Sequence, residues 1–139
     1  MIVLDTNVVS EMALPAPNAT VAGWVIRQPR SDLFLTAVSE AELRYGVEIL
    51  PVGRRRRDLA AAVEKTVRQS FAGRILPFDS DAARAYAEIA AARRAAGDPI
   101  SQADCQIAAI ARSRGAAVAT RDASGFGGCG IKVINPWQA

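Results

Sequence analysis

The chain has 139 residues, half of them hydrophobic, which suits one domain with one core, and we expect a single domain over residues 1–139. It contains no histidine, so catalytic triads or dyads, zinc sites and RNA cleavage that rely on histidine are all excluded. Any catalysis must use carboxylates, hydroxyls, lysine, arginine or a bound metal. The net charge of +3 favours an anionic partner only weakly.

Targeting and membrane signals are absent from the sequence pattern. The longest uncharged stretch, residues 12–26, is interrupted by Pro15 and Pro17 and is too short to cross a bilayer. The N-terminus has no basic segment before its first apolar run, as a signal peptide would. Only two cysteines are present, too few for a disulfide framework. We therefore expect a cytoplasmic protein with no membrane contact.

The first part of the chain alternates strands and helices. Short apolar runs predict buried strands at residues 2–4 and 33–36. Helical spacing predicts a helix after the first strand, a second helix near 19–28 and a third that Ser39 opens and that ends before Pro51.

The second part continues the alternation. A long helix beginning with four arginines, an alanine-rich helix and a helix capped by Ser101 are predicted, and three further strands lie between and after them. Their ranges are 54–72, 81–96 and 101–114 for the helices and 74–76, 117–120 and 131–134 for the strands. Five short buried strands separated by helices predict an α/β fold with a mainly parallel five-stranded sheet.

Four acidic residues lie where a parallel sheet forms its sites, in the crevice beyond the carboxyl ends of the strands. Asp5 follows the first strand and Asp122 follows the fourth. Glu42 and Asp104 each come three residues after a predicted capping serine. Each acid alone also fits an ordinary role, because aspartates stabilise turns and acids in this spacing form capping boxes. The functional hypothesis depends on all four facing one crevice.

Converging carboxylates need a cation, because their charges repel and raise one another's pKa. An oxygen-only set without histidine or cysteine suits Mg²⁺ or Mn²⁺, which can activate water for attack on a phosphodiester. Apart from these four acids, 17 basic residues face ten acidic ones. A phosphate backbone is therefore a fitting partner.

Two other patterns bear on function. Four consecutive arginines, Arg54, Arg55, Arg56 and Arg57, crowd the positive end of a predicted helix, which points to RNA, to a contact with a partner protein or a second copy of the chain, or to a solvated surface. Residues 125–130 match GxGxxG, but no strand–helix context surrounds them, so they predict a loop and not a nucleotide site.

Six segments in chain order form a pattern that is more specific than any single motif. They are IVLDTNVVSE at 2–11, SEAELRYGV at 39–47, FAGRILPFD at 71–79, ADCQIAAIA at 103–111, VATRD at 118–122 and NPW at 135–137. This pattern resembles the PIN-domain ribonucleases that are toxins of type II toxin–antitoxin systems, of the VapC kind and its FitB-like branch.

The resemblance implies a three-layer α/β/α sandwich that cleaves RNA, leaving a 5′-phosphate and a 3′-hydroxyl. It implies Mg²⁺, with Mn²⁺ as a substitute, a VapB-like or FitA-like antitoxin, DNA contact only through that antitoxin, and a homodimer or larger assembly. The residues that match the family's catalytic and metal positions are Asp5, Glu42, Asp104 and Asp122, and those that match its supporting positions are Asn7 and Thr120.

One position departs from the family pattern. Many relatives carry asparagine where this chain has Asp122, and an aspartate three residues later, where this chain has Gly125. No acidic residue follows Asp122, so it is the only candidate for the fourth acid. Direct contact with a metal and contact through water both remain open.

Two other functions are compatible with these residues. One is a PIN-like module that binds RNA or acts mainly with an antitoxin in regulation, with little nuclease activity. The other is a structure-specific DNA nuclease that uses the same metal chemistry. Chelation separates the first from a nuclease, because EDTA abolishes metal-dependent cleavage and leaves simple electrostatic binding largely intact.

Overall fold

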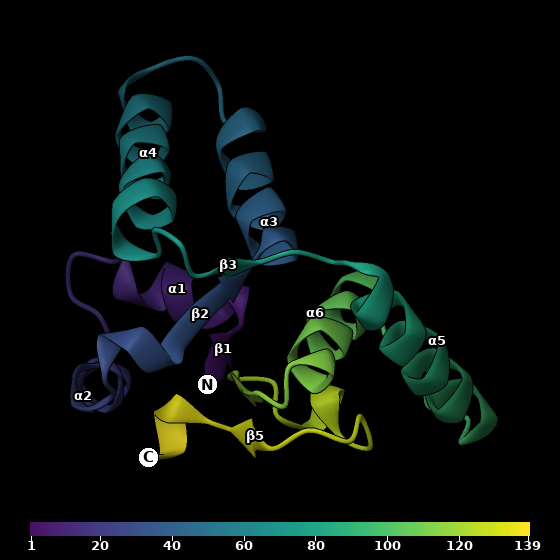
Figure 1. Cartoon of the computed structure of the whole chain (residues 1–139). Coiled ribbons are helices and arrows are strands. Elements are labelled where there is room, and N and C mark those ends of the chain that lie inside the picture. The colour runs from purple at the N-terminus through teal and green to yellow at the C-terminus, as the bar shows by residue number, and fades with distance from the viewer.

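The computed structural model describes all residues, 1–139, and its centre is one five-stranded sheet in the order β3-β2-β1-β4-β5 (Figure 1). All four neighbouring pairs are parallel, and β1 lies in the middle. The predicted parallel sheet is confirmed, although three strands are shorter than predicted. The bounds are β1 Ile2–Leu4, β2 Leu33–Thr36, β3 Ile75–Leu76, β4 Ala117–Ala119 and β5 Val133–Ile134.

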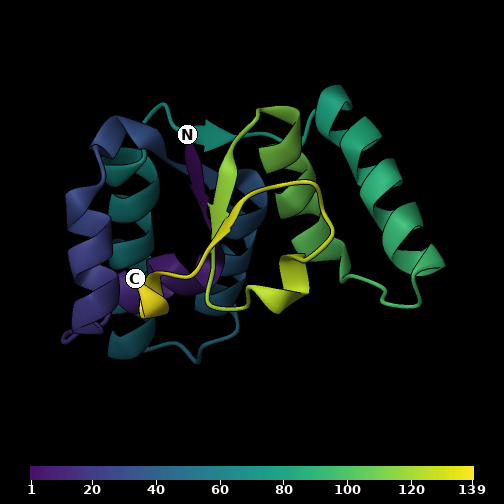
Figure 2. The ribbon, with the colours of Figure 1, turned by 90° about the horizontal axis from the view of Figure 1, so that it is seen from below.

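Helices cover both faces of the sheet, as Figure 2 shows, with α2 and α4 on one side and α5 and α6 on the other. Alternate side chains of a strand enter opposite layers: Val3 packs with the α5–α6 side and Leu4 with the α1–α2 side. The predicted α/β/α sandwich is confirmed. The helices are α1 Thr6–Met12, α2 Ala19–Arg27, α3 Ala37–Glu48, α4 Arg54–Lys65, α5 Ser80–Ala95 and α6 Gln102–Ser113.

Helices α3 and α4 form a hairpin that stands out from the sheet (Figure 1). Val47, Val63 and Val67 form a small core between them. Arg44 pairs with Glu40 on its own helix at 2.8 Å and with Glu64 on α4. The hydrogen bonds that Arg44 donates to Glu64 and Glu40 raise the pKa of its guanidinium. The valine contacts carry most of the stability of this hairpin, because ion pairs at exposed sites contribute little.

The predicted start of α3 at Ser39 is wrong. The helix begins at Ala37, and Thr36 is its N-cap, because the Thr36 side-chain oxygen accepts a hydrogen bond from the backbone N–H of Ser39 at 3.0 Å. Strand β2 thus passes into α3 without a loop. Glu42 consequently lies in the second turn of α3, so the capping-box alternative for Glu42 is also wrong.

The predicted helix over 54–72 is too long. Regular α-helix ends at Lys65, and a π-helical turn over Thr66–Ser70 follows, closed by a hydrogen bond from the Phe71 N–H to the Thr66 carbonyl at 3.0 Å. The wider turn brings Phe71 into the core with β1 and α2. Gly73 then reverses the chain with a positive φ of 72°.

The glycine-rich segment is a loop, as predicted. Ser124–Phe126 forms one 3₁₀ turn, no helix follows it, and Gly128 and Gly130 adopt positive φ before β5. The nucleotide-binding interpretation therefore has no structural support. None of the helices combines the length and the apolar character that crossing a membrane requires.

Candidate active site

The four predicted acids line one cavity of about 540 Å³ at the carboxyl ends of β1 and β4. Strand β1 delivers the first acid, the segment after β4 delivers the last, and helices α3 and α6 deliver the other two. Only two lining residues are hydrophobic. The lining residues are Asp5, Thr6, Asn7, Ser10, Glu11, Leu14, Glu42, Asp104, Arg121, Asp122 and Trp137.

Asp5 lies at the buried floor of this cavity, with 7% of its surface exposed. Its Oδ1 accepts a hydrogen bond from the Thr6 N–H at 2.8 Å, and its Oδ2 accepts one from the Thr120 hydroxyl at 2.8 Å. Burial raises the pKa of Asp5 above its ordinary value, and the charges of Asp104 and Glu42 raise it further. The two hydrogen bonds oppose this rise. Asp104 and Glu42 therefore lie close enough to Asp5 to act on its carboxylate electrostatically.

The fully buried Thr120 hydroxyl links the two ends of the chain. Besides donating to Asp5, it accepts hydrogen bonds from the Asp122 N–H at 3.0 Å and from Asn7 Nδ2 at 3.4 Å. Asn7 Oδ1 accepts in turn from the Arg121 N–H at 3.4 Å. Thr120 thus contacts a carboxylate directly, whereas Asn7 holds the segment that carries Asp122.

Glu42 is exposed and is held from α1. The Thr6 hydroxyl lies 2.8 Å from Glu42 Oε1 and 2.9 Å from the hydroxyl of the buried Ser39. Because this hydroxyl carries one proton, it donates to Glu42 and accepts from Ser39. The contacts of Thr6 with Ser39 and Glu42 could not be predicted from the sequence, because the partners are more than 30 residues apart in the chain.

Asp104 lies half-buried in the first turn of α6, as predicted, and its backbone N–H donates to the hydroxyl of Ser101 at 3.2 Å. The carboxylate of Asp104 accepts no hydrogen bond from the protein, so all its lone pairs are available in the cavity.

Asp122 lies at the rim and folds back on its own turn. Its Oδ1 accepts hydrogen bonds from the Gly125 N–H at 3.2 Å and the Ser124 hydroxyl at 3.3 Å. A Cβ atom at position 125 would lie 2.9 Å from Asp122 Cγ, and closer still to Oδ2. The carboxylate therefore occupies space that only a glycine at 125 leaves open.

Arg93 of α5 holds the loop that follows Asp122. This buried arginine donates to the carbonyls of Asp98, Gly125 and Gly127 at 2.7 to 2.9 Å. It thereby fixes Gly125, which binds the Asp122 carboxylate. This role of Arg93 could not be predicted from the sequence, because an arginine in an alanine-rich helix is usually exposed to solvent.

The donor chemistry of the cavity fits a hard divalent cation. All its charged ligand candidates are carboxylates. Burial raises the pKa of Asp5, the charges of Asp104 and Glu42 add to this rise, and a cation in the cavity would offset both effects. No three acidic side chains lie close enough in this structure to enclose an ion. Mg²⁺ does not need such a cage, because it is usually held by one or two carboxylates and keeps several waters.

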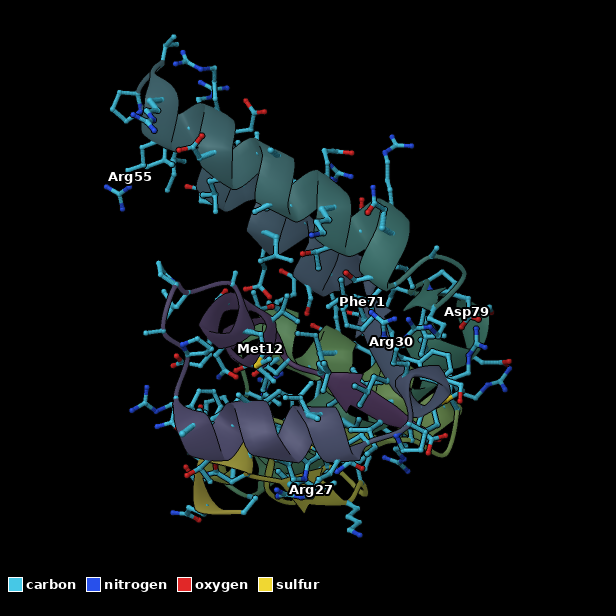
Figure 3. All side chains as sticks on the ribbon, turned by 90° about the vertical axis from the view of Figure 1, so that its left-hand side faces the viewer. Met12, Arg27, Arg30, Arg55, Phe71 and Asp79 are labelled. Carbon is cyan, nitrogen blue, oxygen red and sulfur yellow. The ribbon has the colours of Figure 1, made fainter.

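The four consecutive arginines do not line the cavity. They lie at the start of α4, and Figure 3 shows Arg55 at the outer end of the α3–α4 hairpin. Arg56 pairs with Glu48 at 2.9 Å and Arg54 approaches Asp58 at 3.8 Å, whereas Arg55 and Arg57 form no ion pair. Arg56 therefore stabilises the hairpin, and the side chains of Arg55 and Arg57 remain available to a partner.

A second cavity of about 470 Å³, here called the apolar groove, lies between α1, α2 and the π-helical turn. Figure 3 shows Met12, Phe71 and Arg30 around its opening. Eight of its 13 lining residues are hydrophobic, in contrast to the acidic cavity. Exposed apolar surface of this kind is typical of interaction sites.

The family model described as "PIN domain" matches residues 2–126. The chain belongs to the PIN-domain family. It is 47% identical to the plasmid stability protein StbB of Pseudomonas syringae pv. tomato over all of both chains. It is 45% identical to the VapC ribonuclease Y4jK of Sinorhizobium fredii and 42% identical to the toxin FitB of Neisseria gonorrhoeae, each over 99% of both chains.

Solved structures place the chain in the same branch of the PIN-domain family. The crystal structure of FitAcB from Neisseria gonorrhoeae matches with a TM-score of 0.93 and 42% identity over all of both chains. The structure of FitAB bound to an IR36 DNA fragment matches with a TM-score of 0.92 and 42% identity over 99% of this chain and 96% of the other. The chain is thus a VapC/FitB-like toxin of the PIN-domain family.

Proposed function

We propose that this PIN-domain toxin is a Mg²⁺-dependent endoribonuclease, acting in the cytoplasm, that hydrolyses RNA phosphodiester bonds to a 5′-phosphate and a 3′-hydroxyl. The observation that carries the proposal is the single cavity that Asp5, Glu42, Asp104 and Asp122 share at the carboxyl edge of the sheet. The relative named a VapC ribonuclease supports it.

Each acid has a distinct place in the proposed site. Asp5, Glu42 and Asp104 would supply one or two direct ligands to Mg²⁺ or Mn²⁺ and bind it otherwise through its waters, with Asp122 as the fourth acid at the rim. When bound, the metal supplies a Lewis acid for the phosphate and a water of lowered pKa. Thr120 and Thr6 orient the carboxylates of Asp5 and Glu42 through their hydrogen bonds.

Cleavage of RNA by the purified, antitoxin-free protein tests the proposal. We expect cutting in Mg²⁺ or Mn²⁺, none in EDTA, and a loss of at least 100-fold in Asp5→Asn and Asp104→Asn, as for removal of preorganised catalytic groups. Asp81→Asn is a matched control, because this exposed acid of α5 lies outside the cavity and pairs only distantly with Arg84. Equal cleavage by the wild type and both site variants would refute the proposal.

The same assay separates the two alternatives. Parallel substrates of identical sequence, one RNA and one DNA, distinguish a ribonuclease from a DNA nuclease. Binding of RNA that persists in EDTA without any cleavage in Mg²⁺ would instead favour the binding module.

A cognate VapB-like or FitA-like antitoxin is the proposed partner, and DNA would be bound only through it. The structure of FitAB on DNA supports this assignment. We propose that a segment of the antitoxin binds in the apolar groove, where Ile26 lines the groove and is 78% exposed. Ile26→Asp should weaken copurification with the antitoxin and leave cleavage unchanged, whereas Ile49→Asp, an exposed residue elsewhere, should alter neither.

The unpaired arginines of α4 are proposed as outlying RNA contacts. Arg55→Gln with Arg57→Gln should lower the affinity for RNA and its salt dependence without changing the melting temperature. Arg56→Gln is the comparison, because Arg56 pairs within the hairpin and should affect mainly stability. Self-association through α5 remains a prediction, which the mass of the purified protein in solution tests.

A further inference from the structure

The acidic cavity contains one basic side chain, Arg121, and one aromatic side chain, Trp137, and the two are stacked. The guanidinium carbon of Arg121 lies 5.2 Å from the centre of the Trp137 ring, within the range of a cation–π contact. Both residues line the cavity together with the four acids.

The Arg121 guanidinium is free to bind a ligand. Although five carboxylates, those of the four predicted acids and of Glu11, line the same cavity, none of the ion pairs in the structure involves Arg121. Its side chain is exposed and donates to no protein acceptor. The guanidinium of Arg121 lies over the indole with its N–H donors unused. Two of these N–H groups can bind two oxygens of one phosphate at the same time.

The backbone of both residues is fixed. The Arg121 N–H donates to Asn7 Oδ1 at 3.4 Å, and its carbonyl accepts from Asn135 Nδ2 at 3.5 Å. Asn135 Oδ1 also accepts from the Trp137 N–H at 3.0 Å. The half-buried Trp137 ring packs against the α1–α2 side of the core. One residue, Asn135, therefore couples the two binding groups.

We propose that Arg121 and Trp137 form a nucleotide subsite beside the acids, in which Arg121 binds an RNA phosphate and Trp137 stacks on a base of the single strand. This inference rests on the proposed ribonuclease function and adds to it the residues that bind the RNA strand. An RNA strand that enters a cavity lined by five carboxylates needs a positive contact from the protein, and Arg121 is the only basic side chain that lines it. An aromatic platform beside a cation is how proteins hold single strands.

The test uses binding, separated from cleavage by the Asp104→Asn background in Mg²⁺. The probe is a fluorescent single-stranded RNA dodecamer of randomised sequence, and its partner is an abasic ribose-phosphate dodecamer of equal charge. Arg121→Gln should weaken binding of both probes and reduce the slope of log affinity against log salt by about 0.7, the value of one single-strand phosphate contact. Arg94→Gln, an exposed and unpaired arginine of α5 outside the cavity, should change neither.

Trp137→Leu should weaken the intact dodecamer about tenfold, the range of one base stack, and leave the abasic dodecamer unchanged. Trp137→Phe keeps a stacking ring and should bind nearly as well as the parent. If Trp137→Leu fails to fold, the Arg121 variants and the preference of the parent for the intact over the abasic probe still decide the matter.

Equal affinity of the Arg121→Gln and parent proteins for RNA would overturn the inference while leaving the nuclease proposal intact. So would a loss confined to antitoxin binding, which would make the pair a protein contact. Conversely, subsite-dependent RNA binding by a wild-type protein that cuts no RNA in Mg²⁺ would support the subsite and refute the nuclease proposal.

Discussion

The Thr120 hydroxyl and the Asp5 carboxylate are 115 positions apart in the chain and 2.8 Å apart in the structure. The same hydroxyl accepts hydrogen bonds from the segments on both sides of the cavity. It is therefore the group on which the position of the central acid depends most directly.

Replacing Thr120 with valine keeps the shape and removes the hydroxyl. The change leaves a buried Asp5 oxygen and the Asp122 N–H without this partner, which should cost about 1–3 kcal/mol of unfolding free energy. The lost hydrogen bond should also raise the pKa of Asp5 further. Urea unfolding and the pH profile of cleavage measure the two effects, with Thr120→Ser as the variant that retains the hydroxyl. A stable Thr120→Val protein with an unshifted profile would contradict this role.

The raised pKa of Asp5 makes the stability of the metal-free protein depend on pH. Between the ordinary value of 3.8 and the higher folded-state value, the folded chain binds this proton more tightly than the unfolded chain does. The stability associated with this group is thus present below pH 3.8 and is lost as pH rises through the folded-state pKa. In EDTA, Asp5→Asn should gain stability relative to the wild type over this interval. Parallel unfolding curves for the two proteins at every pH would exclude the effect.

Divalent cations should stabilise the folded protein, because they would bind the folded cavity and not the unfolded chain. At 100 times the dissociation constant the gain is about 2.7 kcal/mol. Thermal melts in increasing Mg²⁺ or Mn²⁺ measure it, and Asp104→Asn should reduce it while Asp81→Asn retains it. A rise of the melting temperature that is the same in all three proteins would indicate binding elsewhere.

Gly125→Ala should displace the Asp122 carboxylate, because the added Cβ would lie 2.9 Å from Asp122 Cγ. We expect the exposed carboxylate to turn aside at little cost in stability and a cleavage rate as low as that of Asp122→Asn. Adding Asp122→Ala to Gly125→Ala should lower the rate no further, since the carboxylate has already left its place. Gly46→Ala in α3 meets nothing within 4 Å and should be tolerated. Additive effects of the changes at 122 and 125 would rule out the collision.

Arg93→Ala should loosen the loop after Asp122, since three carbonyls lose their donor. Acceptors left without their donor cost about 1–3 kcal/mol. Limited proteolysis should then cut within residues 123–130, and Arg84→Ala, which removes an exposed ion pair with Asp81 on the same helix, serves as the control. An Arg93→Ala protein as stable and protease-resistant as the wild type would show that the conformation of the loop does not depend on Arg93.

Most of the fold, and the convergence of the acids, could be predicted from local patterns. Apolar runs such as residues 2–4 set the strands, and a carboxylate directly after a parallel strand is carried to one edge of the sheet. The start of α3 was misplaced because Thr36 and Ser39 are both good N-cap residues, and only burial of Thr36 at the end of β2 decides between them.

The groups that hold the acids could not be predicted, because their partners are distant in sequence. The contact of Thr6 with Glu42 spans 36 positions and that of Arg93 with Gly127 spans 34. The place of Asp122 at the rim also depends on the absence of a side chain at Gly125. Such relationships arise only when the loops pack.

The central position of β1 has a consequence for the synthesis of the protein. The Asp5 N–H donates to the Ala119 carbonyl, and β1 pairs along its length with β4. A nascent chain on the ribosome therefore cannot assemble the cavity until nearly all of its residues have emerged from the exit tunnel. The acidic cavity therefore forms only after translation has delivered β4 and the segment that carries Asp122.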